Sequence, residues 1–208
     1  MAALAIARKS QKSRSADTIE KILNATLDTI YDHGFQNATT SVIAMRAGIS
    51  RGALMHHFPR KEKLIAEAVR HMLLLEISEI QKLAENVANE EMSLDDFLDE
   101  LWTHFSGRLF MTTMEYLAAA RTDRYLKKEL KPSSLEFNEA LDQIWLRFFK
   151  GATVSNEVKR LAFTTTICLL RGMAVNSMLR DDKVLFSDLL AFWKEHLRSI
   201  LKYGEHSG

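Results

Sequence analysis

Two prolines and eight glycines are few for a chain of 208 residues. Both residue types mark turns, so a fold of many short strands joined by tight turns is disfavoured. Long helices need few such residues in their interiors. The composition therefore predicts an all-α protein.

Cysteine and long apolar runs are scarce too. The only cysteine, Cys168, cannot form an intrachain disulfide, which favours a reducing compartment. No uninterrupted apolar run reaches the ~18 residues of a membrane-spanning helix. The first residues place a short apolar piece before basic residues, the reverse of a signal peptide. We expect a cytoplasmic protein without a membrane partner, in which residues 1–14 form a flexible basic tail.

The common signatures of enzyme and metal chemistry are also missing. The sequence contains no P-loop, no dinucleotide fingerprint and no GxSxG. His56 and His57 are adjacent, so on a helix they point ~100° apart and cannot chelate one ion well. Cys168 lies in the apolar segment TTTICLLRGM, which is typical of a buried, inert thiol. We therefore expect no catalytic residue, no metal and no cofactor.

Charge is distributed unevenly along the chain. Residues 1–70 carry 11 Lys and Arg against 6 Asp and Glu, whereas the remaining residues carry 17 against 21. Residues 1–70 are therefore net basic and the remaining residues net acidic. This asymmetry indicates a polyanion as partner of the N-terminal region only, although a basic tail can also serve solubility alone.

The N-terminal region contains the pattern of a helix-turn-helix. Apolar residues at helical spacing predict a helix over 16–33, which Gly34 ends in a left-handed conformation. Thr39 or Thr40 can cap a second short helix, and Gly48 ends it. Ser50 then caps the helix RGALMHHF. Two short helices joined by a turn of three to four residues with a glycine are typical of this DNA-binding motif.

The rest of the chain also has helical periodicity. It predicts helices over 60–87, 94–106, 108–121, 123–150, 156–180 and 184–203. Ser93 and Asp96 form a capping box at the start of the second of these, and Pro132 should kink or interrupt the fourth. The acidic segment SLDDFLDE is explained by capping and a solvated face.

The last two helices have more apolar surface than a one-sided helix needs. Residues 156–180 show two apolar stripes on opposing sides, so both sides should be buried. Burial within one chain and a homodimer interface are the two interpretations, and we favour the dimer because few elements remain to cover this end of the chain. The predicted interface comprises Phe163, Ile167, Leu170, Ala174, Met178, Phe192 and Trp193.

Aromatic and thioether side chains are abundant after residue 100. Most must belong to the core, but such side chains also line adaptable ligand pockets. The candidate lining of an apolar effector pocket comprises Phe105, Leu109, Phe110, Met114, Leu117, Phe137, Leu141, Trp145 and Met173.

The segment ILNATLDTIYDHGFQNATTSVIAMRAGISRGALMHHFPRKEKL resembles the DNA-binding region of TetR-family transcriptional regulators. The matching features are Gly34-Phe35, the threonine before the second helix, IA..AG, IS.G.L, HF and KE.L, all in register. The resemblance implies a helix-turn-helix domain at 15–60 and a helical effector-binding and dimerisation domain at 61–208. It also implies a homodimer, most often a repressor, that binds a palindromic operator and is released by a small effector.

Carried over by position, the resemblance implies a set of DNA-contacting residues. Arg51 can offer a bidentate fork to guanine, and Lys61 can neutralise a phosphate. Ala53 and Met55 depart from the threonine and tyrosine that the family often has, and Ala53 could touch a thymine methyl. The alternative is a helical small-molecule-binding protein or enzyme without a DNA role. The predicted contacts are Thr39, Thr40, Ser50, Arg51, Gly52, Ala53, Met55, His56 and Lys61.

Overall fold

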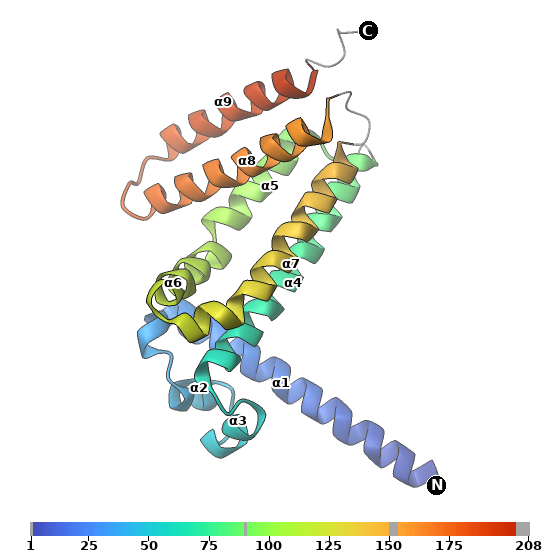
Figure 1. Ribbon diagram of the computed structural model, residues 1–208, viewed down its shortest axis with the longest axis vertical. Coiled ribbons are helices and arrows are strands. Elements are labelled where there is room, and N and C mark those ends of the chain that lie inside the picture. The colour runs from blue at the N-terminus through green and yellow to red at the C-terminus, as the bar shows by residue number, and fades with distance from the viewer. Residues whose placement is uncertain (1, 90, 150–153, 203–208) are drawn as a thin grey trace. The chain divides into compact units, whose positions relative to one another are not determined.

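The computed structural model describes residues 2–89, 91–149 and 154–202, with side chains for all of these except 2–14, 148 and 202. This part of the chain is built from helices without a strand, so the all-α prediction is confirmed (Figure 1). The helices are α1 (Ala2–Asn37), α2 (Thr40–Arg46), α3 (Arg51–His57), α4 (Lys61–Ala88), α5 (Leu94–Ser106), α6 (Arg108–Thr122), α7 (Arg124–Phe148), α8 (Asn156–Ser177) and α9 (Lys183–Lys202).

Local capping explains where several helices begin. Before α5, the Ser93 hydroxyl accepts the Asp96 N–H, while the Asp96 carboxylate accepts the Ser93 N–H, which confirms the predicted capping box. The hydrogen bond from the Ser93 hydroxyl also lowers the pKa of Asp96. The Ser155 hydroxyl caps α8 in the same way by accepting the Val158 N–H.

Two helices differ from the sequence-based expectation. The backbone of α1 is helical from Ala2, where a flexible tail was expected up to residue 14. The alanine-rich start AALAIA has a high helix propensity, which favours this continuation. Helix α7 continues through Pro132, so of the two predicted outcomes, a kink or an interruption, the interruption is wrong. Its buried residues on both sides of the proline, Leu130 and Phe137 among them, supply the packing that offsets the lost hydrogen bond.

The chain forms two compact units. Unit 1 comprises the residues up to Leu73 together with Thr112–Ser133, and unit 2 comprises Leu74–Met111 together with the residues from Ser134 onward. Helices α4, α6 and α7 therefore each contribute a segment to both units. The units do not coincide with the predicted segments 15–60 and 61–208, because the first half of α4 and residues 112–133 cluster with the N-terminal helices.

An aromatic cluster lies in the core of unit 2. The Trp145 ring, which is 1% exposed, lies 4.4 Å from the Phe149 ring and 4.7 Å from the Phe163 ring, centroid to centroid. Its indole N–H donates to the Lys159 carbonyl at 2.6 Å. The cluster thereby joins α7 to α8 through stacking and a buried hydrogen bond.

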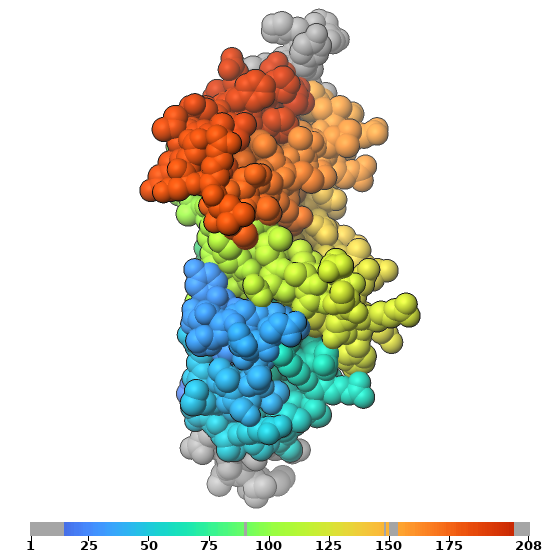
Figure 2. Space-filling model, turned by 90° about the vertical axis from the view of Figure 1, so that its left-hand side faces the viewer, coloured from blue at the N-terminus to red at the C-terminus, as the bar shows by residue number. Residues whose placement is uncertain are grey.

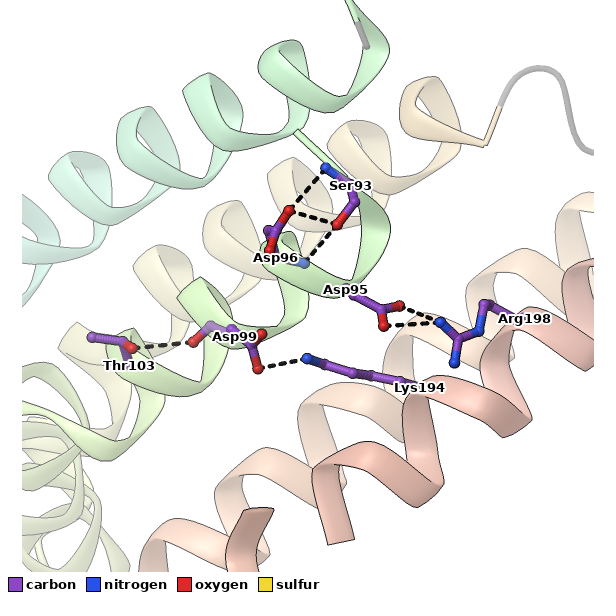
Figure 3. Close-up of polar contacts among 7 residues, drawn as sticks. All are labelled: Ser93, Asp95, Asp96, Asp99, Thr103, Lys194 and Arg198. Carbon is purple, nitrogen blue, oxygen red and sulfur yellow. Dashed lines mark hydrogen bonds and ion pairs between the residues drawn. The ribbon is translucent and has the colours of Figure 1, made fainter. Parts of the chain in front are cut away.

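Ion pairs join α5 to α9 at the surface of unit 2 (Figure 3). Arg198 Nη1 donates to both carboxylate oxygens of Asp95 at 2.8 Å, and Lys194 Nζ lies 2.6 Å from Asp99 Oδ1. The acidic segment SLDDFLDE is therefore not simply a solvated face. Each helix contributes residues four apart, so the two pairs lie one turn from each other along both helices.

Candidate nucleic-acid interface

The end of α1 determines where the helix-turn-helix begins. Gly34 has φ 76° and ψ 161°, so the helical backbone breaks there, as the sequence predicted. The Phe35 N–H is consequently directed to a partner outside the helix, the Glu115 carboxylate of α6, at 2.8 Å. The sequence contained no signal for this contact, because the two residues are 80 positions apart.

The N-caps of α2 and α3 and the glycine between the two helices have the predicted geometry. The Thr39 hydroxyl accepts the Val42 N–H at 3.3 Å, and the Ser50 hydroxyl accepts the Ala53 N–H at 3.1 Å. Gly48 has φ 69°, the left-handed conformation that ends α2. Thr39, and not Thr40, is therefore the N-cap of α2. In Figure 2 residues 15–57, from α1 to α3, form part of the surface of unit 1 (blue to cyan).

The rotation of α3 separates its buried side from its exposed side. Leu54 and Phe58 are buried, which confirms them as the inward side. Met55 and His57 are half-buried. The exposed residues of the segment are Arg51, Gly52, Ala53 and His56.

Arg51 and Arg46 differ in how far their charge is available. The guanidinium of Arg46 is paired with Asp32 and lies 3.8 Å from Asp28, so α1 carboxylates neutralise it. No residue in the described ranges forms an ion pair with Arg51, which is exposed at the first position of α3. Arg51 is therefore the arginine of the α2–α3 segment with a guanidinium free to bind a base or a phosphate.

Lys61 has a partner that the sequence did not reveal. Its Nζ donates to the Phe35 carbonyl at 3.3 Å and lies 4.9 Å from the centre of the Phe35 ring. Partial burial lowers the pKa of Lys61, with the nearby Glu62 carboxylate opposing that shift. A phosphate would thus have to compete with the Phe35 carbonyl for this ammonium group.

The predicted dimer residues of α8 are for the most part core residues. Phe163, Ile167, Leu170 and Ala174 are buried within the chain, which contradicts their assignment to an intermolecular face. Helix α8 contacts both α5 and α9 within the chain. In α9, Trp193 is half-buried and its indole donates to Thr166 Oγ1 at 2.9 Å.

A different stripe of α8 is exposed. Its members follow one another at intervals of three or four residues, so they share one face of the helix. Cys168, expected to be buried, is exposed at its centre. Met178 and Phe192 also stay exposed, as the dimer prediction requires. We call Leu161, Thr165, Cys168, Gly172 and Val175 the α8 stripe; Leu179, just beyond the end of α8, is exposed as well.

The predicted effector-pocket residues do not all lie in one unit. Met114 and Leu117 belong to unit 1, and Leu117 is 53% exposed, so it lines no interior site in this structure. Leu109 is half-buried in unit 2, and the Phe105 ring lies 5.7 Å from the Arg171 guanidinium. The members buried in unit 2 are Phe105, Phe110, Phe137, Leu141, Trp145 and Met173.

The described residues contain neither a metal-binding cluster nor a membrane-spanning helix. Within 2–89, 91–149 and 154–202, no group of three or more His, Cys, Asp or Glu side chains is placed to hold a metal ion. None of the helices in these ranges is long and apolar enough to cross a membrane.

Comparisons with known proteins agree with the helix-turn-helix geometry. A family model described as bacterial regulatory proteins, tetR family, matches residues 22–68. An uncharacterized HTH-type transcriptional regulator of Mycobacterium tuberculosis is 30% identical over 123 residues, 59% of this chain and 63% of the relative. The chain thus spans less than two thirds of the length of that relative.

Two further similarities cover most of the chain. The HTH-type transcriptional regulator CymR of Pseudomonas putida is 26% identical over 184 residues, 86% of this chain and 88% of CymR. The crystal structure of the transcriptional regulator FadR from Bacillus subtilis in complex with stearoyl-CoA shares the fold, with a TM-score of 0.59 and 16% identity. That match covers 88% of this chain and 97% of FadR. Residues 22–68, which contain the capped helix-turn-helix at residues 39–58, therefore match bacterial regulatory proteins of the tetR family, and the rest of the chain shares the fold of the solved structure.

Proposed function

We propose that this chain is a DNA-binding transcriptional regulator that places α3 in the major groove of a palindromic operator and acts as a repressor in the cytoplasm. The observation that supports this best is the exposed side of α3. It combines an unpaired guanidinium at Arg51, the small residues Gly52 and Ala53, and the His56 imidazole, while Leu54 anchors the helix from behind. A small exposed surface with a cation is suited to close approach to base edges.

The proposal is tested with DNA that flanks the chain's own gene. Fluorescence anisotropy at one fixed salt concentration should show binding at least 10³-fold tighter than to random DNA of equal length, the lower end of the range for specific regulators. Equal affinity for flanking and random DNA would leave a non-specific DNA-binding protein, and binding to neither would favour the alternative without a DNA role.

Arg51→Ala should weaken binding to the operator by about 1–3 kcal/mol, because a bidentate pair with a guanine is lost. Discrimination at one base pair of each half-site should relax, while affinity for random DNA changes far less. Binding constants for the native operator, singly substituted operators and random DNA measure both effects. Arg46→Ala is the matched control, since its charge is already neutralised by α1. Equal losses on all DNA would assign Arg51 to phosphate instead.

Removing residues 2–13 should weaken binding to every DNA sequence alike. The deleted segment contains Arg8, Lys9 and Lys12 and no acidic residue. If all three contact phosphates, the slope of log affinity against log salt should become shallower by about 0.9 per contact. Affinities at four or five salt concentrations give the slope. An unchanged slope would show that the tail serves solubility and not DNA binding.

The homodimer part of the proposal rests on the α8 stripe. Leu161 is 60% exposed and Val175 43%, and Leu179, just beyond the end of α8, is 99% exposed; together they form a large exposed apolar surface. In α9, Val184 and Phe192 add further exposed apolar surface. Pairing of this stripe with that of a second copy would bury it and bring two copies of α3 onto one palindrome.

We assign the effector site to unit 2, where most of the predicted pocket residues are buried. FadR, which shares the fold, is in complex with stearoyl-CoA, so the fold accommodates an apolar ligand in that protein. Trp145 lies in the aromatic cluster of unit 2 and is a natural reporter. Titration with stearoyl-CoA, followed by tryptophan fluorescence and by loss of DNA anisotropy, tests whether a ligand of that class acts here.

A further inference from the structure

Phe35 occupies a junction in unit 1. It follows Gly34, where the backbone of α1 leaves helical geometry, and it lies four residues before Thr39, the N-cap of α2. Its backbone N–H and its backbone carbonyl each bind a charged side chain. Glu115 of α6 accepts the N–H at 2.8 Å, and Lys61, the first residue of α4, donates to the carbonyl at 3.3 Å.

The contact with Lys61 joins the two ends of the helix-turn-helix. The motif lies between Phe35 and Lys61 in the sequence, so this hydrogen bond joins the chain just before α2 to the chain just after α3. The ammonium group also lies over the Phe35 ring, 4.9 Å from its centre, which adds a cation–π attraction. The two ends of the DNA-binding segment are therefore held at one residue.

The contact with Glu115 adds a third element. A carboxylate that accepts a backbone N–H forms a charge-assisted hydrogen bond, which is stronger than a neutral one. A Cβ on Gly34 would lie 3.4 Å from Glu115 Oε2, an ordinary contact, so φ 76° and not lack of space favours glycine there. Glu115 itself is exposed, so its carboxylate serves this contact and not the packing of the core.

We propose that Glu115 is the positioning residue through which α6 sets the path of the chain into the helix-turn-helix. The inference rests on the proposed DNA-binding function. Helix α6 is continuous from Arg108, in unit 2, to Thr122, in unit 1. A displacement of α6 along or about its axis would thus move the Glu115 carboxylate, and with it the Phe35 peptide that leads into α2. Because operator affinity depends on the placement of α3, a displacement of α6 would change that affinity.

The test compares three variants with wild type. Glu115→Ala removes the acceptor, and Glu115→Gln keeps an acceptor oxygen without the charge. Glu129→Ala is the control. It removes a carboxylate of α7 in the same unit, and Glu129 forms no hydrogen bond or ion pair with the described residues. We expect Glu115→Ala to lower operator affinity at least tenfold relative to Glu129→Ala, with random-DNA affinity unchanged within about twofold because phosphate charges are untouched. Glu115→Gln should be intermediate.

A second measurement does not depend on DNA. Hydrogen exchange of the Phe35 amide in the full-length protein should become at least tenfold faster in Glu115→Ala, while the amides of α8 keep their protection. Operator affinities of Glu115→Ala and Glu129→Ala that agree within twofold would overturn the inference, as would an unchanged exchange rate at Phe35. Failure of the wild-type protein to bind any DNA would instead overturn the proposed function, and the exchange experiment would still report whether the contact exists.

Discussion

Glutamate at both Leu161 and Val175 is expected to convert the proposed dimer into monomers. It should also lower affinity for a two-half-site operator by about 10²–10⁴-fold, because binding to the second half-site is no longer intramolecular. Both residues are exposed on the α8 stripe, so the chain should fold normally with two added charges there. In a dimer the same charges would be buried against an apolar partner surface. Light scattering and operator titration measure the two effects.

The control for this experiment is Leu135→Glu. Leu135 is 52% exposed on α7, away from the α8 stripe in the sequence, so its substitution should leave both dimer and operator affinity intact. Glutamate at Ile167 and Leu170, by contrast, would unfold unit 2, since both are buried within one chain. A dimer that survives Leu161→Glu with Val175→Glu would show that the copies associate through another surface.

Trp145→Ala should lower the free energy of unfolding by about 3–5 kcal/mol, the usual range for a large aromatic residue removed from a core. The substitution deletes the stacking with Phe149 and Phe163 and leaves the Lys159 carbonyl without its indole donor. Trp145→Phe retains part of the packing and should cost less. Chemical denaturation at one fixed protein concentration measures the effect, because the stability of a dimer depends on concentration.

Phe192→Ala is the matched aromatic control for this measurement. The Phe192 side chain is 65% exposed on α9, so its removal should change stability by no more than about 0.5 kcal/mol in the monomeric Leu161→Glu, Val175→Glu background. Equal effects of Trp145→Ala and Phe192→Ala would contradict the placement of Trp145 at the centre of the unit 2 core.

Features that depend on neighbouring residues in the sequence could be predicted without the structure. The left-handed glycines at 34 and 48, the Ser50 cap and the Ser93–Asp96 capping box each involve groups no more than four residues apart. Their backbone geometry follows from local sterics and local hydrogen bonds. For the same reason the start of α5 and the inward side of α3 were predicted correctly.

Features that depend on a distant partner were decided only by the tertiary structure. Periodicity shows that a helix has apolar faces but not which neighbour covers each, so Ile167 and Leu170 were assigned to a dimer although both are buried within one chain. Charged residues likewise reveal no partner from sequence: Asp95 pairs with Arg198 across 103 positions, and Glu115 binds the Phe35 N–H across 80. The sequence by itself determined the helices and the helix-turn-helix, because those follow from local interactions. Only the packing of the helices decided which side chains are exposed and which distant residues they contact.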